Sequence, residues 1–156
     1  ALLEGISKVM LAQAQEVVFA KATAKSMKPE LVAKICKSAS ELYGEAIAVV
    51  VRQKELDGQW TMHLRAKCDY YASEAEYRMS IHHEEKGEWG RCVARLREAV
   101  RVAHGAAGVA NGLPFASNIA EYIAKVAGVL KKAEHDNQLI YTETVPSTSS
   151  LDIISG

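Results

Sequence analysis

The densest group of residues able to bind a metal or transfer a proton is "HHEE", residues 82–85. Imidazole and carboxylate groups ligate zinc and iron, so one interpretation is a metal-dependent enzyme that uses His82, His83 and Glu84. Adjacent residues of a helix point about 100° apart, however, so the two histidines cannot share a metal on a straight helix. The run also lacks the H-E-x-x-H motif and the Glu-x-x-His pairs of di-iron bundles. We therefore interpret it as a solvated helix end and expect no metal and no cofactor.

The other reactive residues also lack the sequence context that catalysis requires. Cys36, Cys68 and Cys92 are far apart, form no CxxC pair and lie within helical patterns, as buried thiols of a reducing cytosol do. The Gly-rich stretch 105–112 follows a helical pattern rather than a strand, and the sequence has no phosphate-binding or nucleophile-elbow motif. We predict no catalytic residue and expect that the chain is not an enzyme.

Polar side chains interrupt the most apolar stretch of the chain, "VMLAQAQEVVFA". A buried amide or carboxylate without a partner costs several kcal/mol. Gln13, Gln15 and Glu16 are therefore expected to form hydrogen bonds between helices or to face solvent. The same reasoning treats three tyrosines as core residues whose hydroxyl groups have partners. These are Tyr70, Tyr71 and Tyr77.

Helical periodicity dominates the sequence, and no segment shows sustained strand-like alternation. Five helices are predicted, over about residues 4–25, 29–51, 58–86, 88–107 and 117–138. The turns between them are short, which forces neighbouring helices to run antiparallel. The predicted fold is an all-α antiparallel array, because no other element type has a supporting pattern.

Capping residues locate several helix ends. Asp57, in the turn Glu55–Trp60, is a plausible N-cap of the third helix, and Gly87 suits its C-terminal end. Ser117 or Asn118 is expected to cap the fifth helix.

The segment "GEWGRCVARLREAV" is similar to the second helix of a tetratricopeptide repeat, but no second copy follows at that period. A repeat-like hairpin and an ordinary antiparallel hairpin therefore both remain open.

The composition bounds the organisation of the chain. Its 156 residues suffice for one domain, which we divide into a helical array, 1–138, and an extended non-helical segment, 139–156, packed on the helices. Leu139, Ile140 and Tyr141 are expected to hold that segment in place. The opening "ALLEGISKVM" reads as mid-helix sequence, so we expect a piece of a longer, cytoplasmic chain without a secretory leader.

Charge is balanced, with 19 basic and 19 acidic residues, which gives no support to nucleic-acid binding. Apolar runs are shorter than the roughly 20 residues that span a bilayer. Four arginines of the fourth helix could form a basic convex strip, which would support weak peripheral membrane contact at most. They are Arg91, Arg95, Arg97 and Arg101.

Three stretches of the chain together carry a resemblance to a known family. They are "MLAQAQEVVFAKAT" with "MKPELVAKI", then "AKCDYYASEAEYRMSIHHEEKGEWGRCVARLREA", and finally "KKAEHDNQLIYTETVP". In this order they resemble the Bro (BRO-one-like) domain of ALIX-type ESCRT-associated proteins, approximately its latter half. The resemblance covers almost the whole chain and implies a helical core with tetratricopeptide-like hairpins.

The resemblance also implies a function. Bro domains of this type are non-enzymatic adaptors that bind the C-terminal amphipathic helix of an ESCRT-III subunit, of the charged multivesicular body protein type, during endosomal sorting and membrane scission. The matching positions here are Val18, Lys21, Leu31 and Ile35. Relatives of the fold also act near Rho GTPases and in fungal pH-response signalling, which is the alternative function.

The spacing of these four residues fits one surface. The turn between the first two helices centres near Met27, so Val18, nine residues before it, and Ile35, eight after it, lie at nearly the same height of an antiparallel hairpin. Lys21 and Leu31 pair likewise, nearer the turn. Family members often carry an aromatic residue where Val18 stands, and the exchange removes about 1–2 kcal/mol of apolar contact. The alternative interpretation is that all four residues are buried core.

Overall fold

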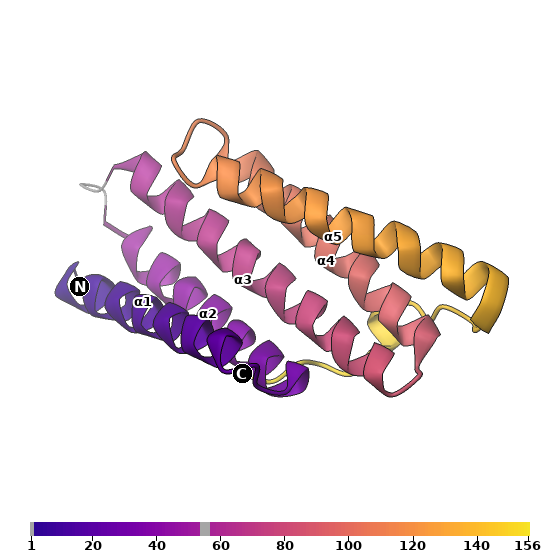
Figure 1. The fold of residues 1–156 in the computed structure, drawn as a ribbon. Helices are drawn as coiled ribbons and strands as arrows, with labels where there is room; N and C mark the ends of the chain where they lie inside the picture. The colour runs from indigo at the N-terminus through magenta and orange to yellow at the C-terminus, as the bar shows by residue number, and fades with distance from the viewer. Residues whose placement is uncertain (1, 54–56) are drawn as a thin grey trace.

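The computed structural model describes residues 2–53 and 57–156, and within these ranges it contains helices and no strand. The five α-helices are α1 (Leu2–Ala24), α2 (Pro29–Val50), α3 (Gly58–Glu85), α4 (Trp89–Ala110) and α5 (Ala116–Asp136). Successive helices run antiparallel, and α3 lies between α2 on one side and α4 on the other (Figure 1). The predicted all-α antiparallel array is therefore confirmed.

Local chemistry explains where several helices begin and end. The Asp57 carboxylate accepts a hydrogen bond from the Gln59 N–H at 3.0 Å, as expected of an N-cap. Gly87 has φ +71°, a left-handed conformation that glycine adopts without the strain of a Cβ, at the end of α3. Residues 55 and 56 of the predicted turn lie outside the described ranges.

The predicted cap of α5 is wrong. Ser117 and Asn118 lie inside the helix, and Phe115, which has no capping side chain, occupies the N-cap position. The preceding turn is closed instead by backbone hydrogen bonds, from Leu113 N–H to the Ala110 carbonyl and from Ala116 N–H to the Leu113 carbonyl. The start of α5 is therefore set by the backbone conformation of the turn, which capping preferences of single residues do not predict.

Polar residues of the apolar α1 stretch have the partners or the exposure that the sequence predicts. Glu16 accepts a hydrogen bond from the Tyr43 hydroxyl of α2 and forms an ion pair with Lys67 of α3 at 3.2 Å. Gln15 donates to the backbone carbonyl of Ile35 at 3.5 Å, and Gln13 is exposed. These contacts link α1 to both α2 and α3.

The C-terminal segment differs from its predicted form. Helical structure continues beyond α5 through a π-helical turn at Asn137–Tyr141, and a 3₁₀ turn forms at Thr148–Ser150. The expected anchors Leu139 and Ile140 are 65% and 66% exposed, so they do not hold the segment. Tyr141 does contribute, because its ring stacks on Trp89 with centroids 3.8 Å apart.

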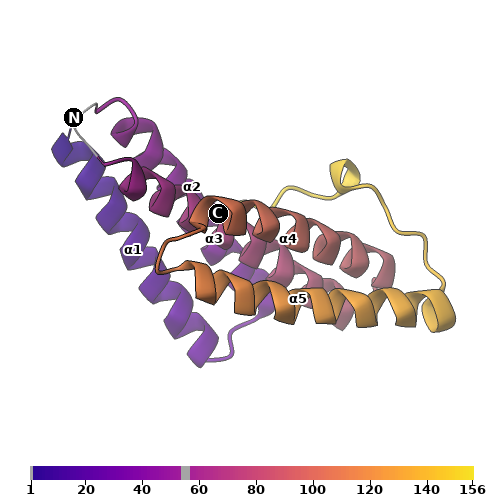
Figure 2. The same cartoon turned by 90° about the horizontal axis from the view of Figure 1, so that it is seen from above.

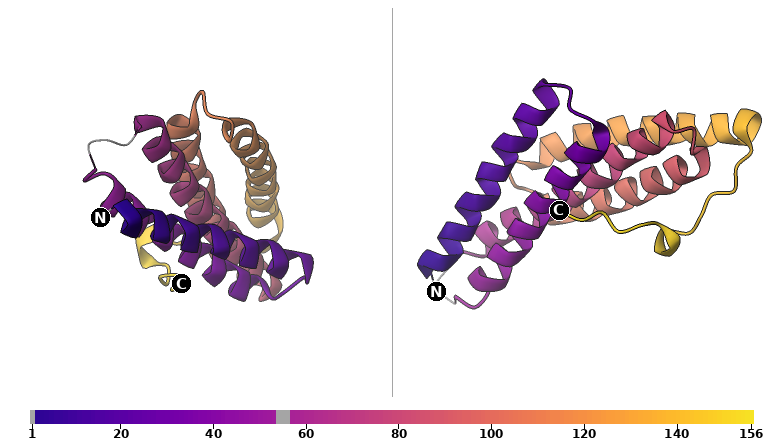
Figure 3. Two further views of the ribbon diagram at one scale, coloured as in Figure 1. Left: turned by 90° about the vertical axis from the view of Figure 1, so that its left-hand side faces the viewer. Right: turned by 90° about the horizontal axis from the view of Figure 1, so that it is seen from below.

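We call residues 142–156 the C-terminal strap. It leaves the end of α5 and runs back over α4 towards α2, so that the chain end lies beside the α1–α2 hairpin (Figures 2 and 3). Asn137, in the preceding π-helical turn, holds the beginning of the strap. Its amide donates to the Glu143 carbonyl at 2.9 Å, and its side-chain oxygen accepts from the Glu143 N–H at 3.1 Å. The Glu143 carboxylate then accepts a hydrogen bond from Gly90 N–H at 2.8 Å.

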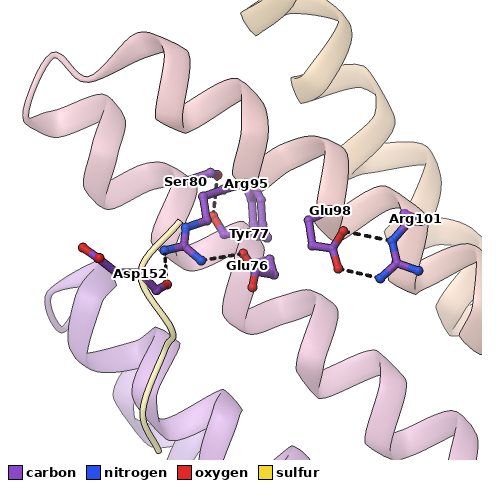
Figure 4. Close-up of polar contacts among 7 residues, drawn as sticks. All are labelled: Glu76, Tyr77, Ser80, Arg95, Glu98, Arg101 and Asp152. Atoms are coloured by element: carbon purple, nitrogen blue, oxygen red, sulfur yellow. Dashed lines mark hydrogen bonds and ion pairs between the residues drawn. The ribbon is translucent and has the colours of Figure 1, made fainter. Parts of the chain in front are cut away.

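The predicted basic strip on α4 does not form as an array of free charges. Arg95 is buried, with 4% of its surface exposed, and each of the four arginines lies within 3.1 Å of a carboxylate (Figure 4 shows two of the pairs). The pairs are Arg91–Glu88, Arg95–Glu76, Arg97–Glu134 and Arg101–Glu98. Because these charges are matched, they offer little net attraction to an anionic lipid surface.

None of the described helices combines the length and the apolar character that spanning a bilayer requires.

Candidate partner-binding site

The α1–α2 hairpin carries the four residues that the sequence singles out, two on each helix. Val18 and Leu31 are each 43% exposed, Ile35 is half-buried, and Lys21 is exposed. The interpretation that all four are sealed core therefore fails for this chain. We call these four residues the hairpin patch.

The turn between α1 and α2 sets the register of the hairpin patch. Ser26 has φ +49°, and Met27 N–H donates to the Ala22 carbonyl at 3.0 Å, which ends α1. Pro29 then begins α2, where its missing N–H costs no hydrogen bond. The Gln15 bond to the Ile35 carbonyl confirms that Ile35 stands level with the middle of α1.

A compact interior supports the hairpin patch from below. Phe19 and Ile35, both partly buried, pack against a cluster formed by α1, α2, α3 and the strap. The buried members of that cluster are Ala22, Val32, Ala33, Cys36, Ala75, Met79 and Ile154. Phe19 points inward, with its ring edge-on to Tyr71 at 5.8 Å between the two ring centroids. The Arg78 guanidinium lies 5.4 Å from the centroid of the Phe19 ring.

Three exposed lysines lie on the α1–α2 hairpin near its turn, one of them in the hairpin patch itself. Lys21, Lys25 and Lys28 are exposed near the turn, and the ion pairs among the described residues include none of them. Lys34, in contrast, pairs with Glu30 at 3.6 Å. Sequence reasoning found Lys21 and missed Lys25 and Lys28, although their positions beside the turn were a signal available in the sequence. An apolar surface beside these lysines suits an acidic, amphipathic partner.

The histidines and cysteines that the sequence singles out lie within the helices α2, α3 and α4. Within the described part of the chain, no three His, Cys, Asp or Glu residues lie close enough together to hold a metal ion. His82 and His83 have ring centroids 5.8 Å apart, and His83 faces Glu88, with Nδ1 3.4 Å from the carboxylate. Burial raises the pKa of the Cys92 thiol to about 12 and also raises the pKa of the Cys36 thiol, as is typical of thiols in apolar surroundings.

Three comparisons place the chain among known proteins. The family model of the BRO1-like domain matches residues 1–156. The chain is 34% identical over 158 residues to the pH-response regulator protein palA/RIM20 of Pyricularia oryzae, covering 99% of this chain and 19% of that protein. It is 33% identical over 149 residues to the programmed cell death 6-interacting protein of Homo sapiens, covering 96% and 17%.

A solved structure agrees with these matches. The chain superposes on the ALIX BRO1 domain in a complex with CHMP4C with a TM-score of 0.88 and 32% identity, over 97% of this chain and 42% of that one. It spans about a fifth of the length of the two curated relatives, at 19% and 17%.

Proposed function

Since the chain belongs to the BRO1-like domain family, we propose that it is a non-enzymatic adaptor domain that binds the C-terminal amphipathic helix of an ESCRT-III subunit. The hairpin patch is the observation that carries this proposal, because apolar side chains of two helices remain exposed there beside Lys21. The likeness to a BRO1 domain in a complex with CHMP4C supports it. In this proposal the chain is the latter half of a longer Bro domain that acts in the cytoplasm and is recruited to endosomal membranes.

The chemistry of the hairpin patch determines what it would bind. Val18 and Leu31 come from neighbouring antiparallel helices and both are exposed, so a guest helix could cover them with apolar residues spaced three and four apart. Covering a fully exposed leucine stabilises a complex by about 1.5–3 kcal/mol, and Leu31, which is 43% exposed, can gain only about that fraction of it. The exposed lysines Lys21, Lys25 and Lys28 would orient the guest helix more than they would raise its affinity, because exposed ion pairs contribute about 0–1 kcal/mol each.

Substituting Leu31 tests the proposal. A labelled peptide of the C-terminal helix of an ESCRT-III subunit is titrated against wild type and Leu31→Asp by fluorescence anisotropy. We expect Leu31→Asp to weaken binding at least about tenfold, because it places a charge against the apolar face of the guest. Leu31 is already 43% exposed, so the variant should fold.

The matched control is Ile140→Asp, which puts the same charge on a 66% exposed isoleucine beyond α5 and should bind like wild type. Equal binding by wild type and Leu31→Asp, or no binding by wild type, would contradict the proposed function.

The fungal relative favours a second candidate function. The pH-response regulator of Pyricularia oryzae is 34% identical over nearly the whole chain, and Val18 offers less apolar surface than the aromatic residue expected there. A scaffold in pH-response or Rho GTPase signalling would use the same patch for a different peptide. Affinity capture from a fungal lysate, followed by mass spectrometry, distinguishes the two when wild type and Leu31→Asp are compared. Loss of ESCRT-III subunits with Leu31→Asp supports the first function, and loss of only another protein supports the second.

A further inference from the structure

The strap buries a single side chain, and that side chain enters the interior beneath the hairpin patch. Within residues 142–156, Ile154 is 5% exposed, whereas its neighbour Ile153 is 90% exposed. Ile154 belongs to the cluster that includes Cys36 and Met79, against which Phe19 and Ile35 pack. Residues more than a hundred positions apart in the sequence therefore share one small core.

Independent contacts hold the strap along its path to this core. The buried Arg95 guanidinium donates to the Asp152 carbonyl at 2.6 Å while it pairs with Glu76 of α3 at 3.1 Å (Figure 4). Gly90 of α4 approaches the strap so closely that a Cβ there would lie 2.2 Å from the Thr144 oxygen. These contacts fix the strap on α4 just before Ile154 reaches the interior.

The end of the strap lies against α2. A Cβ on Gly156 would lie 2.7 Å from the Ser38 nitrogen and 2.8 Å from Glu41 Oε2, so the last residues follow the α2 surface closely. Ser38 is one helical turn from Ile35, counted as i,i+3 on α2. The strap thus touches the helix that carries half of the hairpin patch.

We infer that the strap is a positioning element of the hairpin patch, with Ile154 supporting Ile35 from the interior. This inference rests on the proposed function, since it concerns the same surface. Cores are close-packed, and removal of a buried side chain is followed by partial collapse of its neighbours. Ile35 is half-buried at the edge of the cluster, so it can sink inward when Ile154 is lost. The guest helix would then meet a lower, less complementary surface.

Linkage makes the coupling reciprocal. If docking of the strap raises the affinity for the partner by some factor, then binding of the partner must raise the equilibrium constant for strap docking by the same factor. A substitution that detaches the strap would therefore weaken partner binding, although it replaces no residue that touches the guest helix. The strap acts on partner affinity through Ile35 rather than by contact.

Two measurements on the full 156-residue chain test this inference. The first compares the Ile35 δ1-methyl resonance in ¹H–¹³C spectra of wild type and Ile154→Ala, without any partner. We expect the resonance to shift in Ile154→Ala. It should remain unchanged in Ile153→Ala, which alters the exposed neighbour on the strap, and in Ile119→Ala, which removes an equal volume from a buried site of α5 in a different cluster.

The second measurement titrates the same ESCRT-III peptide against these variants. Ile154→Ala should weaken binding by about fivefold or more, the lower end of ordinary coupling between sites, and both controls should bind like wild type. An unchanged Ile35 methyl, or equal affinity of Ile154→Ala and wild type, overturns the inference. Absence of binding by wild type together with a shifted Ile35 methyl would instead overturn the proposed function and leave the positioning contact standing.

Discussion

At the scale of single residues, Val18 shows how one position adjusts an otherwise complete surface. It is 43% exposed on α1, next to Phe19, which points into the core. The hairpin patch thus presents a β-branched aliphatic side chain where the family resemblance leads one to expect an aromatic ring. The geometry of the patch remains, but the area available to a guest helix is smaller.

Restoring an aromatic side chain tests this view of Val18. Val18→Phe should strengthen binding of the ESCRT-III peptide by about 1–2 kcal/mol, or about five- to thirtyfold, because a phenyl ring buries more apolar area on contact. Isothermal titration calorimetry measures the change. Val129→Phe, at a partly exposed position of α5, is the control and should leave affinity unchanged. A weaker complex with Val18→Phe would show that the guest needs the small side chain.

At the scale of elements, α4 contacts several parts of the chain at once. Cys92, Leu96 and Ala99 belong to a cluster with residues of α3 and α5, whereas the Gly90 N–H and the Arg95 guanidinium donate to Glu143 and Asp152 of the strap. The residues of α4 are therefore constrained by these contacts as well as by helix propensity. The glycine in its first turn is explained by the strap, since only the absence of a Cβ leaves room for the Thr144 carbonyl.

Two glycine-to-alanine exchanges on α4 separate propensity from close approach. Gly105→Ala, where a Cβ would meet no atom within 4 Å, should raise the free energy of unfolding by about 0.5–1 kcal/mol through helix propensity. Gly90→Ala should lower it, because the clash with Thr144 displaces the strap. Urea unfolding followed by circular dichroism gives both values. If both variants are stabilised, the strap does not dock on α4 as described.

At the scale of the whole molecule, the helices differ in how many of their residues are buried. Ten residues of α3 are buried, because it packs between α2 and α4. Only four residues of the 23-residue α1 are buried, namely Gly5, Val9, Ala12 and Ala22. The helix that carries Val18 and Lys21 therefore has few buried residues and packs mainly against one neighbour, α2.

This difference predicts unequal local stability. In hydrogen exchange followed by mass spectrometry, peptides from α1 should exchange through openings of lower free energy than peptides from α3. Adding the ESCRT-III peptide should slow exchange in α1 and α2 more than in α5. Uniform protection of α1 and α3 would indicate that the chain opens only as a whole.

Much of the fold followed from local rules. Helical periodicity predicted all five helices, and Asp57 and Gly87 predicted the two ends of α3, because a cap or a positive φ depends on neighbours in sequence. The family resemblance, carried by motifs in one order, is confirmed by the BRO1-like match over residues 1–156. The assignment of the partner site to the hairpin patch stays a prediction, although Val18, Lys21 and Leu31 are exposed.

Tertiary contacts decided the rest. Arg95 carries the same charge as Arg97 and lies two residues before it in the sequence, yet it is buried because Glu76 and the strap carbonyl of Asp152 satisfy it. Leu139 and Ile140 are as apolar as Ile154, yet only Ile154 finds a cluster to enter. Sequence by itself determined which segments are helical and which family they belong to, since periodicity and motifs are local. Which side chains are covered depends on segments that are distant in the chain and adjacent in space, so only the folded structure could decide it.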